Sequence, residues 1–257
     1  MPVSHLHPQL KEAAHLLRSS HERKQSRRTV LEGEHLVVLY AQQCGAPLML
    51  VVSQKYEAHP LAKKFGQHLL IADDAWFSKN APTSAGMVAV IDEPISTERR
   101  GHFCVLLDDV QDPGNAGSIL RTAAAAGCSD VIFSEKSVSA WSPKTLRAAQ
   151  GAHFLLNIIE EVDLVAFAHH FRAQKGALIA ALPSGGTPLY HAPLIASEDV
   201  PLGVIVGNEG AGISLPLVSL ADHRVTIPMP GGMESLNVGI AAAIVLFECV
   251  RLRSFTR

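Results

Sequence analysis

Several patterns that mark membrane proteins and secreted proteins are missing from this chain of 257 residues. No apolar run approaches the roughly 18 residues that a membrane-spanning helix needs. The amino terminus lacks the charged and then apolar layout of a secretory signal, so we expect a cytoplasmic protein that does not bind a membrane. A hydrophobic share of 47% still supplies a buried core for one large or two small domains.

Motifs for metal, nucleotide-phosphate and hydrolytic sites are also missing. The four cysteines, Cys44, Cys104, Cys128 and Cys249, are scattered and form no CxxC pair, which predicts reduced core residues rather than a zinc site or disulfides. The 13 histidines show no spacing typical of metal ligands, so we expect no metal. The patterns GxxxxGK(S/T), GxGxxG and GxSxG do not occur.

The net charge of -2 is distributed unevenly along the chain. The leader, residues 1–28, is basic, and Arg23, Lys24, Arg27 and Arg28 lie at its end. Such a segment can neutralise phosphates and release counterions, so these four residues are candidate RNA contacts. A solvated, frayed terminus would have the same composition, and charge alone does not choose between the two.

The hydrophobic pattern predicts a small α/β domain over residues 1–95. Helical spacing alternates there with β-rich runs, and a polar, charge-dense segment follows as the candidate linker. The predicted helices are Glu34–Cys44 and Leu61–Phe65, the predicted strands Pro47–Val52 and Met87–Ile91, and the linker Asp92–Gly101. We therefore place a domain boundary between residues 95 and 96.

In residues 96–257, apolar runs of strand length alternate with helical or glycine-rich segments, which predicts a parallel sheet covered by helices. The runs are Phe103–Leu107, Asp130–Phe133, Leu155–Ile159, Ala177–Leu182, Leu202–Val206 and Arg224–Ile227. One helix is expected to begin near Asn115 and end at Gly127, and another to follow a Ser142 cap. A last helix over Leu236–Leu252 has almost no charge before Glu248, so it should be buried against the sheet or a second subunit.

Glycine and polar residues concentrate in three segments at the ends of predicted strands: Asp108–Ala123, Val204–Ser214 and Ile227–Ala243. Loops at the carboxyl ends of parallel strands form the ligand site of open α/β sheets. The first segment leads into a helix start that attracts anions, with Arg121 about one turn inside it. Glu209 and Glu234 lie among the glycines of the other two. Each segment alone is more typical of an ordinary turn, and it is their joint occurrence, together with Asn208, Ser235 and Asn237, that favours a site.

Three motifs resemble those of one family. Asn115–Ala123 resembles the NxGxxxRxA motif of the SpoU (TrmH-like) branch of the SPOUT RNA 2′-O-ribose methyltransferases. Gly207–Gly212 is similar to the second motif and Ile227–Val238 to the third, in the expected order. Pro143–Ala152 resembles a further recurring element, and Gly239 departs from the family, where serine is common.

The resemblance implies a parallel-sheet SPOUT domain with a deep trefoil knot, a homodimer with its active site at the subunit interface, and S-adenosylmethionine as cofactor. The residues implied to hold the cofactor are Gly207, Asn208, Glu209, Ile227, Met229, Ser235, Leu236 and Asn237. The implied catalytic residues are Asn115, Arg121, Glu209, Ser235 and Asn237. Arg121 would also contact RNA, held by a phosphate and Glu209, and would act as a general base or as an electrostatic stabiliser. Ser235 is equally suited to cap the last helix.

Arg28–His35 resembles the start of the L30e-like RNA-binding module of ribosomal RNA members, which favours 23S ribosomal RNA over transfer RNA. Transfer RNA stays open as a substrate. Two other classes also stay open. One is a Rossmann NAD-dependent oxidoreductase that uses the Asp108–Ala123 loop with Glu135 on the ribose, against which the missing GxGxxG counts. The other is a non-catalytic RNA-binding protein that keeps the fold.

Overall fold

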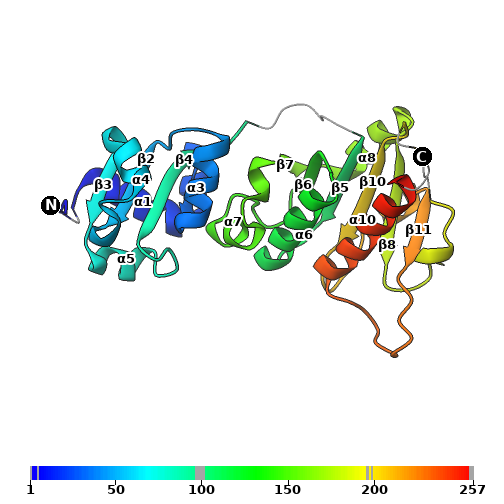
Figure 1. The fold of residues 1–257 in the computed structure, drawn as a ribbon. Coiled ribbons are helices and arrows are strands. Elements are labelled where there is room, and N and C mark those ends of the chain that lie inside the picture. Colours follow the sequence, from blue (N-terminus) through cyan, green and yellow to red (C-terminus); the bar gives the residue numbers. More distant parts are fainter. Residues whose placement is uncertain (1, 5, 96–101, 195–196, 198, 255–257) are drawn as a thin grey trace. The chain divides into compact units, whose positions relative to one another are not determined.

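The computed structural model describes residues 2–4, 6–95, 102–194, 197 and 199–254, and the chain forms two compact units (Figure 1). Unit 1 contains Met1–Ile95 and Trp141–Phe154, and unit 2 contains Ser96–Ala140 and Leu155–Arg257. The sequence predicted one boundary at residue 95, whereas the chain also returns to unit 1 for Trp141–Phe154 before it re-enters unit 2. Of the predicted linker, residues 96–101 lie outside the described residues.

Unit 1 is built on a four-stranded sheet in the order β1-β4-β2-β3. The strands are β1 (Arg28–Glu32), β2 (Met49–Ser53), β3 (Leu69–Ala72) and β4 (Met87–Asp92). β4 is antiparallel to both β1 and β2, and β2 is parallel to β3. Every residue of β2 is buried, in keeping with the unbroken apolar sequence of a strand at the centre of a sheet.

The helices of unit 1 include two that fall in the leader. These are α1 (Pro8–Arg18) and α2 (Ser20–Ser26); the others are α3 (Glu34–Gln43), α4 (Pro60–Lys64), α5 (Asp74–Asn80) and α7 (Pro143–Ala149), with 3-10 turns η1 (Gln54–Tyr56), η2 (Gly66–His68) and η3 (Ala152–Phe154). Leu10 and Leu16 of α1 pack with Trp76 of α5 in the core. The leader is therefore a folded part of unit 1 and not a frayed terminus.

Side-chain contacts hold Trp141–Phe154 in unit 1. Arg147 of α7 forms an ion pair with Glu32, whose side chain is buried at the end of β1. The ring of Phe154 meets the ring of Tyr40 edge-on, with centroids 5.6 Å apart. A segment that lies between two unit 2 strands in the sequence thus completes the packing of unit 1.

Unit 2 contains a seven-stranded sheet in the order β7-β6-β5-β10-β8-β11-β9, in which all neighbouring strands are parallel. The strands are β5 (Phe103–Asp108), β6 (Asp130–Ser134), β7 (Asn157–Val162), β8 (Ala177–Leu182), β9 (Thr187–Pro188), β10 (Leu202–Gly207) and β11 (His223–Thr226). All six predicted strands are present, although β7 begins two residues later than expected. The two-residue β9 was not predicted.

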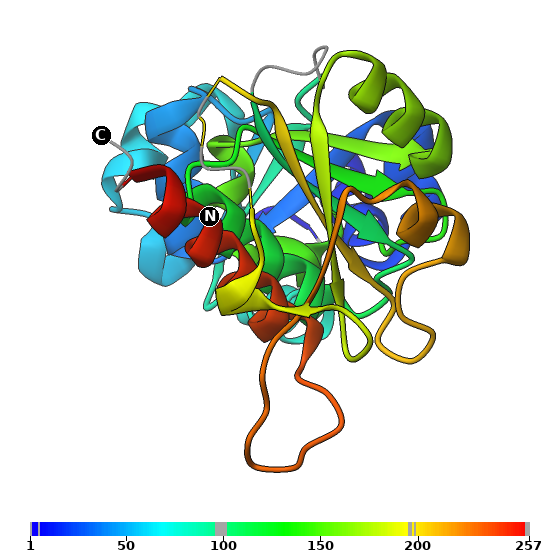
Figure 2. The same ribbon diagram turned by 90° about the vertical axis from the view of Figure 1, so that its right-hand side faces the viewer.

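Helices cover both faces of this sheet. On one face, α8 (Leu164–Ala173) and α9 (Leu215–Leu220) pack through Phe171 and Leu217 onto the strands. On the other, α6 (Pro113–Ala125) and α10 (Val238–Ser254) lie side by side over β5 and β10 (Figures 1 and 2). Gly239 allows the two helices to approach, because a Cβ at that position would lie 3.3 Å from Cβ of Ser118. A short turn, η4 (Leu189–His191), follows β9.

The cysteines are mostly core residues, as predicted. Cys104, Cys128 and Cys249 are buried, whereas Cys44 is exposed because it lies just beyond the end of α3. Burial raises the pKa of Cys249 to about 12, so this thiol stays protonated at neutral pH. In the described part of the chain, no helix is both long and apolar enough to cross a membrane.

The ion pair of Arg147 with Glu32 yields a stability prediction. Arg147→Met leaves Glu32, which is 8% exposed, without its cation. Glu32 keeps its hydrogen bond from Thr83 Oγ1 but loses the donor to its other carboxylate oxygen. A buried group that loses a partner costs about 1–3 kcal/mol, so we expect calorimetry to show a lower melting temperature for unit 1. The matched control is Arg172→Met, which breaks the more exposed pair of Arg172 with Asp222 in unit 2 and should cost less than about 1 kcal/mol. Equal destabilisation by the two variants would contradict this role for Arg147.

Candidate active site

The carboxyl ends of the central strands of unit 2 surround a cavity of about 590 Å³. Its walls come from the segments after β8, β10 and β11 and from the first turn of α10. All the residues that the family resemblance assigned to the cofactor line this cavity, namely Gly207, Asn208, Glu209, Ile227, Met229, Ser235, Leu236 and Asn237. The structure therefore brings the second and third motifs to one place.

One wall of the cavity was missed by the sequence analysis. Leu182, Pro183 and Ser184, at the end of β8, also line it. β8 lies between β10 and β11 in the sheet, so its carboxyl end opens at the same place as theirs. The signal was present in the sequence, because Pro-Ser-Gly-Gly directly after a predicted strand is a turn of the same kind as the other three.

A tight turn, Asn208–Gly212, presents Glu209 at the rim of the cavity. Its ends exchange two backbone hydrogen bonds of 3.0 Å. Asn208 Oδ1 accepts two backbone N–H groups inside the turn, each at 2.9 Å, while Nδ2 donates to the carbonyl of Asp109 at 2.8 Å. A Cβ at Gly207 would lie 2.3 Å from the carbonyl carbon of Gly212, so only glycine fits before this turn. The turn is thus fixed both internally and to the loop after β5.

Three polar side chains from the three motifs form one hydrogen-bonded chain. Asn237 Nδ2 donates to Asn115 Oδ1 at 2.8 Å, and Asn115 Nδ2 donates to Glu209 Oε1 at 2.9 Å. The carboxylate of Glu209 also accepts from the backbone N–H groups of Gln111 at 3.4 Å and Asp112 at 3.2 Å. Glu209 therefore occupies the start of α6, where unpaired N–H groups stabilise an anion.

These contacts keep Glu209 ionised. Burial by itself raises the pKa of its carboxyl, but the hydrogen bonds from Asn115 and from the backbone N–H groups of Glu209, Asp112 and Gln111 outweigh burial and hold the pKa below its usual value. The group is an acceptor in all of these contacts, so it does not act as a proton donor at neutral pH.

The residue that caps the last helix differs from the one that the sequence analysis considered for this role. Asn237 Oδ1 accepts from the N–H groups of Gly239 at 2.9 Å and Ile240 at 3.3 Å, so Asn237 caps α10. Ser235 was considered for this role, but it lies two residues earlier and lines the cavity. Asn237 therefore links the start of α10 to the start of α6.

Arg121 lies apart from this hydrogen-bonded chain. It is exposed on α6 and does not line the cavity. Within the described residues it makes no hydrogen bond or ion pair. The expected pair with Glu209 is not formed, and the Glu209 carboxylate instead accepts from Asn115 and from the backbone at the start of α6. Its guanidinium is thus available to a group from outside this chain.

The candidate RNA contacts of the leader lie in unit 1, and they differ in exposure. Arg23 is 8% exposed and donates to the carbonyl of Leu16 at 2.6 Å, so it is a structural residue and not a surface cation. Arg28 forms ion pairs with two carboxylates at 2.8 and 3.3 Å, and Arg27 lies 3.5 Å from a third. Lys24 is exposed on α2. Acidic neighbours therefore offset much of the positive charge of the leader.

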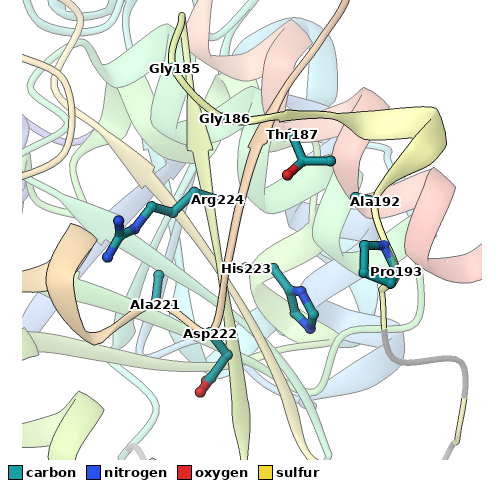
Figure 3. A pocket seen from close by; sticks show the side chains of 9 residues that line it. All are labelled: Gly185, Gly186, Thr187, Ala192, Pro193, Ala221, Asp222, His223 and Arg224. Carbon is teal, nitrogen blue, oxygen red and sulfur yellow. The ribbon is translucent and has the colours of Figure 1, made fainter.

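A second cavity, of about 370 Å³, lies beside β11 and the start of β9 (Figure 3). Its charged lining residues have partners inside unit 2. Asp222 accepts from Arg172 and from a backbone N–H, both at 2.9 Å, and Arg224 Nε donates to a carbonyl at 3.0 Å. Figure 3 shows Arg224 and His223 on opposite sides of the strand. The larger cavity is therefore the candidate active site.

Fold and site together define an α/β protein with a ligand-sized cavity at the carboxyl ends of its parallel strands. From β5 the chain proceeds to β6 and β7 on one side, whereas β10 and β8 lie on the other. A switch point of this kind opens a crevice at the carboxyl ends of the strands, and the cavity lies to one side of it, at the ends of β10, β8 and β11.

Comparison with known proteins gives the family. Residues 102–247 match the SpoU rRNA Methylase family, and the chain belongs to it. Over 236 residues it is 30% identical to the 23S rRNA (guanosine(2553)-2'-O)-methyltransferase RlmP of Bacillus subtilis, across 90% of this chain and 92% of that protein. An uncharacterized tRNA/rRNA methyltransferase of Synechocystis is 34% identical, across 91% and 89%. The AdoMet-bound rRNA methyltransferase of Sinorhizobium meliloti superposes with a TM-score of 0.83 at 27% identity, across 98% and 97%.

This membership confirms the predicted SpoU resemblance and the prediction that the chain is an RNA methyltransferase. The alternatives of an NAD-dependent oxidoreductase and of a protein without catalysis are wrong.

The hydrogen bond between Asn115 and Glu209 yields a prediction about titration. Asn115→Ala removes one of the donors that hold the pKa of Glu209 low, so we expect this pKa to rise toward its ordinary value of about 4.3. Carboxyl-carbon NMR of Glu209 across an acid titration measures it. Asn237→Ala is the control, since Asn237 reaches Glu209 only through Asn115 and should change the pKa less.

The same shift fixes the sign of a stability effect. A carboxyl whose folded pKa is depressed contributes stability above its unfolded pKa and loses it as the pH falls through the folded pKa. In Asn115→Ala the folded pKa of Glu209 lies closer to its unfolded pKa. The contribution of Glu209 to the free energy of unfolding should therefore be smaller, and it should be lost at a higher pH. An unchanged pKa in Asn115→Ala would show that the side-chain hydrogen bond does not set the charge of Glu209.

Proposed function

We propose that the protein transfers a methyl group from S-adenosylmethionine to a ribose 2′-hydroxyl of ribosomal RNA, with 23S ribosomal RNA as the favoured substrate. The observation that carries this proposal is the chain of hydrogen bonds through Asn115, Glu209 and Asn237 at the rim of the cavity. A named 23S rRNA 2'-O-methyltransferase is similar to this chain over 90% of its length, a share that includes both units, and this supports ribosomal over transfer RNA.

The cavity fits S-adenosylmethionine in size and in chemistry. Its volume of about 590 Å³ lies within the range of roughly 300–1,000 Å³ that ligand pockets cover. Ile227, Met229 and Leu236 offer apolar surface for the adenosyl part, and Glu209 and Glu234 bring carboxylates toward a ligand that carries positive charge. The bound cofactor would supply a methyl group already activated on a positively charged sulfur.

The protein's own residues then have to orient the ribose and manage one proton. Asn237 and Ser235 lie at the cavity wall, where their side chains are placed to hold the ribose or the cofactor. Arg121 stabilises the negative charge that develops on the 2′-oxygen as its proton passes to water. A guanidinium group holds its proton too tightly to act as a base at neutral pH, so we assign Arg121 the electrostatic role. An RNA phosphate provides its countercharge, because Glu209 is already engaged.

The site is completed in a homodimer. α10 has no charged residue from Val238 to Phe247 and exposes Ile240 and Phe247, which are 54% and 48% accessible. Exposed apolar surface on a helix is typical of a protein–protein interface. α10 packs beside α6, the helix that carries Arg121, so an interface on this layer would present Arg121 to the partner.

Three finer assignments belong to the same proposal. The sheet order, in which β8 lies between β10 and β11, is compatible with a deep trefoil knot in the carboxyl-terminal part of the chain. The mixed sheet of unit 1, with helices packed against it, is compatible with an L30e-like RNA-binding module. The likeness to a bacterial 23S rRNA methyltransferase supports a cytoplasmic location.

The experiment that tests the proposed reaction uses labelled S-adenosylmethionine with ribosomal and transfer RNA as separate substrates. We expect label in a 2′-O-methylated nucleoside of 23S ribosomal RNA. Arg121→Ala should lower the rate by a factor on the order of 10²–10³, the loss typical for removing one donor to a developing oxyanion, while cofactor affinity is largely retained. Arg172→Ala, an exposed arginine of unit 2 outside the cavity, is the control.

Two outcomes would overturn these assignments. Near-normal turnover by Arg121→Ala would remove Arg121 from the chemistry. Label in transfer RNA, with none in ribosomal RNA, would overturn the substrate.

The proposed interface yields a separate prediction. Ile240→Asp with Phe247→Asp places two charges on the exposed side of α10, so we expect a monomer in light scattering and loss of methyl transfer with unchanged circular dichroism. Leu215→Asp is the control, because Leu215 is 80% exposed on α9, on the other face of the sheet. A dimer that persists in the double variant would move the interface elsewhere.

A further inference from the structure

The two units differ in charge. Unit 1 contains 12 lysines and arginines against 9 acidic residues, whereas unit 2 contains 10 against 15. Affinity for RNA comes largely from cations that neutralise phosphates and release counterions. Unit 1 is therefore the better candidate for binding RNA outside the site of methyl transfer.

The arginines of unit 1 are engaged within that unit. Arg18 donates to Asn80 Oδ1 at 2.8 Å, and Arg147 forms its ion pair with Glu32. Arg23, Arg27 and Arg28 have the backbone and carboxylate partners described above. Charge available to RNA must therefore come mainly from lysines.

The lysines of unit 1 are concentrated in one segment, residues 54–68, which follows β2. Lys55 in η1 and Lys63 and Lys64 in α4 lie within ten positions of one another, and all three are exposed. The other four are spread over four helices, as Lys11, Lys24, Lys79 and Lys144. The segment contains a single acidic residue, Glu57.

Aromatic rings and a neighbouring helix hold part of this segment in place. The ammonium of Lys55 lies 5.1 Å from the centroid of the Tyr56 ring. The Tyr56 ring meets the His59 ring edge-on at 5.8 Å, and His59, the cap of α4, donates to Glu34 at 3.2 Å. Burial, and after it the nearby Glu34 carboxylate, raise the pKa of the Tyr56 hydroxyl, so Glu34 lies beside both Tyr56 and His59 and does not face the lysines alone. Lysines and a fixed ring thus lie together on the surface.

We propose that Lys55, Tyr56, Lys63 and Lys64 form a docking surface for a single-stranded or loop region of the RNA substrate, with the lysines on phosphates and Tyr56 against a base. The inference rests on the proposed function and assigns the RNA contact of unit 1 to the segment after β2 instead of the leader. Single-stranded and loop regions suit this surface because their bases are free to stack on an aromatic ring.

The test compares two triple variants of the full-length protein with equal changes of charge. The first is Lys55→Gln with Lys63→Gln and Lys64→Gln; the matched control is Lys11→Gln with Lys24→Gln and Lys79→Gln, which are exposed lysines elsewhere in unit 1. Binding of unmodified 23S ribosomal RNA transcribed in vitro is measured by filter binding at several salt concentrations, and methyl transfer is measured in parallel.

We expect the first variant to bind RNA about ten-fold or more weakly. Its slope of log affinity against log salt concentration should fall by two to three phosphate contacts, roughly 0.7 for each on a single strand. Its KM for RNA should rise, while kcat at saturating RNA and cofactor binding stay unchanged. In Tyr56→Leu, binding should weaken about five-fold or more, and Tyr56→Phe, which keeps the ring, should restore it.

Equal loss in the two triple variants, or no loss in the first, would overturn the docking surface. Binding is measured without turnover, so the two proposals can fail separately. If RNA binding depends on Lys55, Lys63 and Lys64 but the protein transfers no methyl group, the proposed function is refuted and the docking surface is not.

Discussion

A carboxylate bound at the start of a helix is the contact on which the active site of this SpoU family methyltransferase depends. Glu209 is an acceptor only, so Asn115 must donate to it through Nδ2, which leaves Asn115 Oδ1 facing Asn237. Asn237 must then donate through its own Nδ2, and its Oδ1 faces the N–H groups that begin α10. The charge of one glutamate thereby fixes the orientation of two amides. The two hydrogen bonds join residues that are separated by 94 and by 122 positions in the chain.

The sequence was most informative where burial on both faces of a sheet leaves an unbroken apolar run. β8 was predicted with its observed ends, and the cap at Ser142 and the stop at Gly127 were also right, since both depend on local backbone chemistry. Helix α2 escaped prediction because all 7 of its residues are polar. Helix α1 escaped because its apolar residues find their partners only when β1 and α5 are in place. Trp141–Phe154 was assigned to the wrong unit for the same reason: its partners are distant in sequence.

The candidate site shows the same limit at the level of single side chains. Three motifs identified which residues meet at the cavity, because parallel strands deliver their following loops to one edge. They did not identify the partner that each side chain binds. Asn237, and not Ser235, caps α10, and Glu209 binds the start of α6 in place of Arg121, because the order β5-β10-β8 sets which loops touch. The wall after β8 was missed because its turn lacks charged residues.

The placement of charge separates the two tasks of a methyltransferase that acts on a large RNA. Unit 2 has more acids than bases, which suits a cavity for a cationic cofactor but would repel an RNA backbone. The reaction that we propose there requires one well-placed cation, and Arg121 is exposed and has no partner among the described residues of its own chain. The affinity for RNA requires several phosphate contacts, and unit 1 has the positive balance and the grouped lysines to supply them. With this division, the residues that hold the positively charged cofactor do not also have to bind the polyanionic RNA.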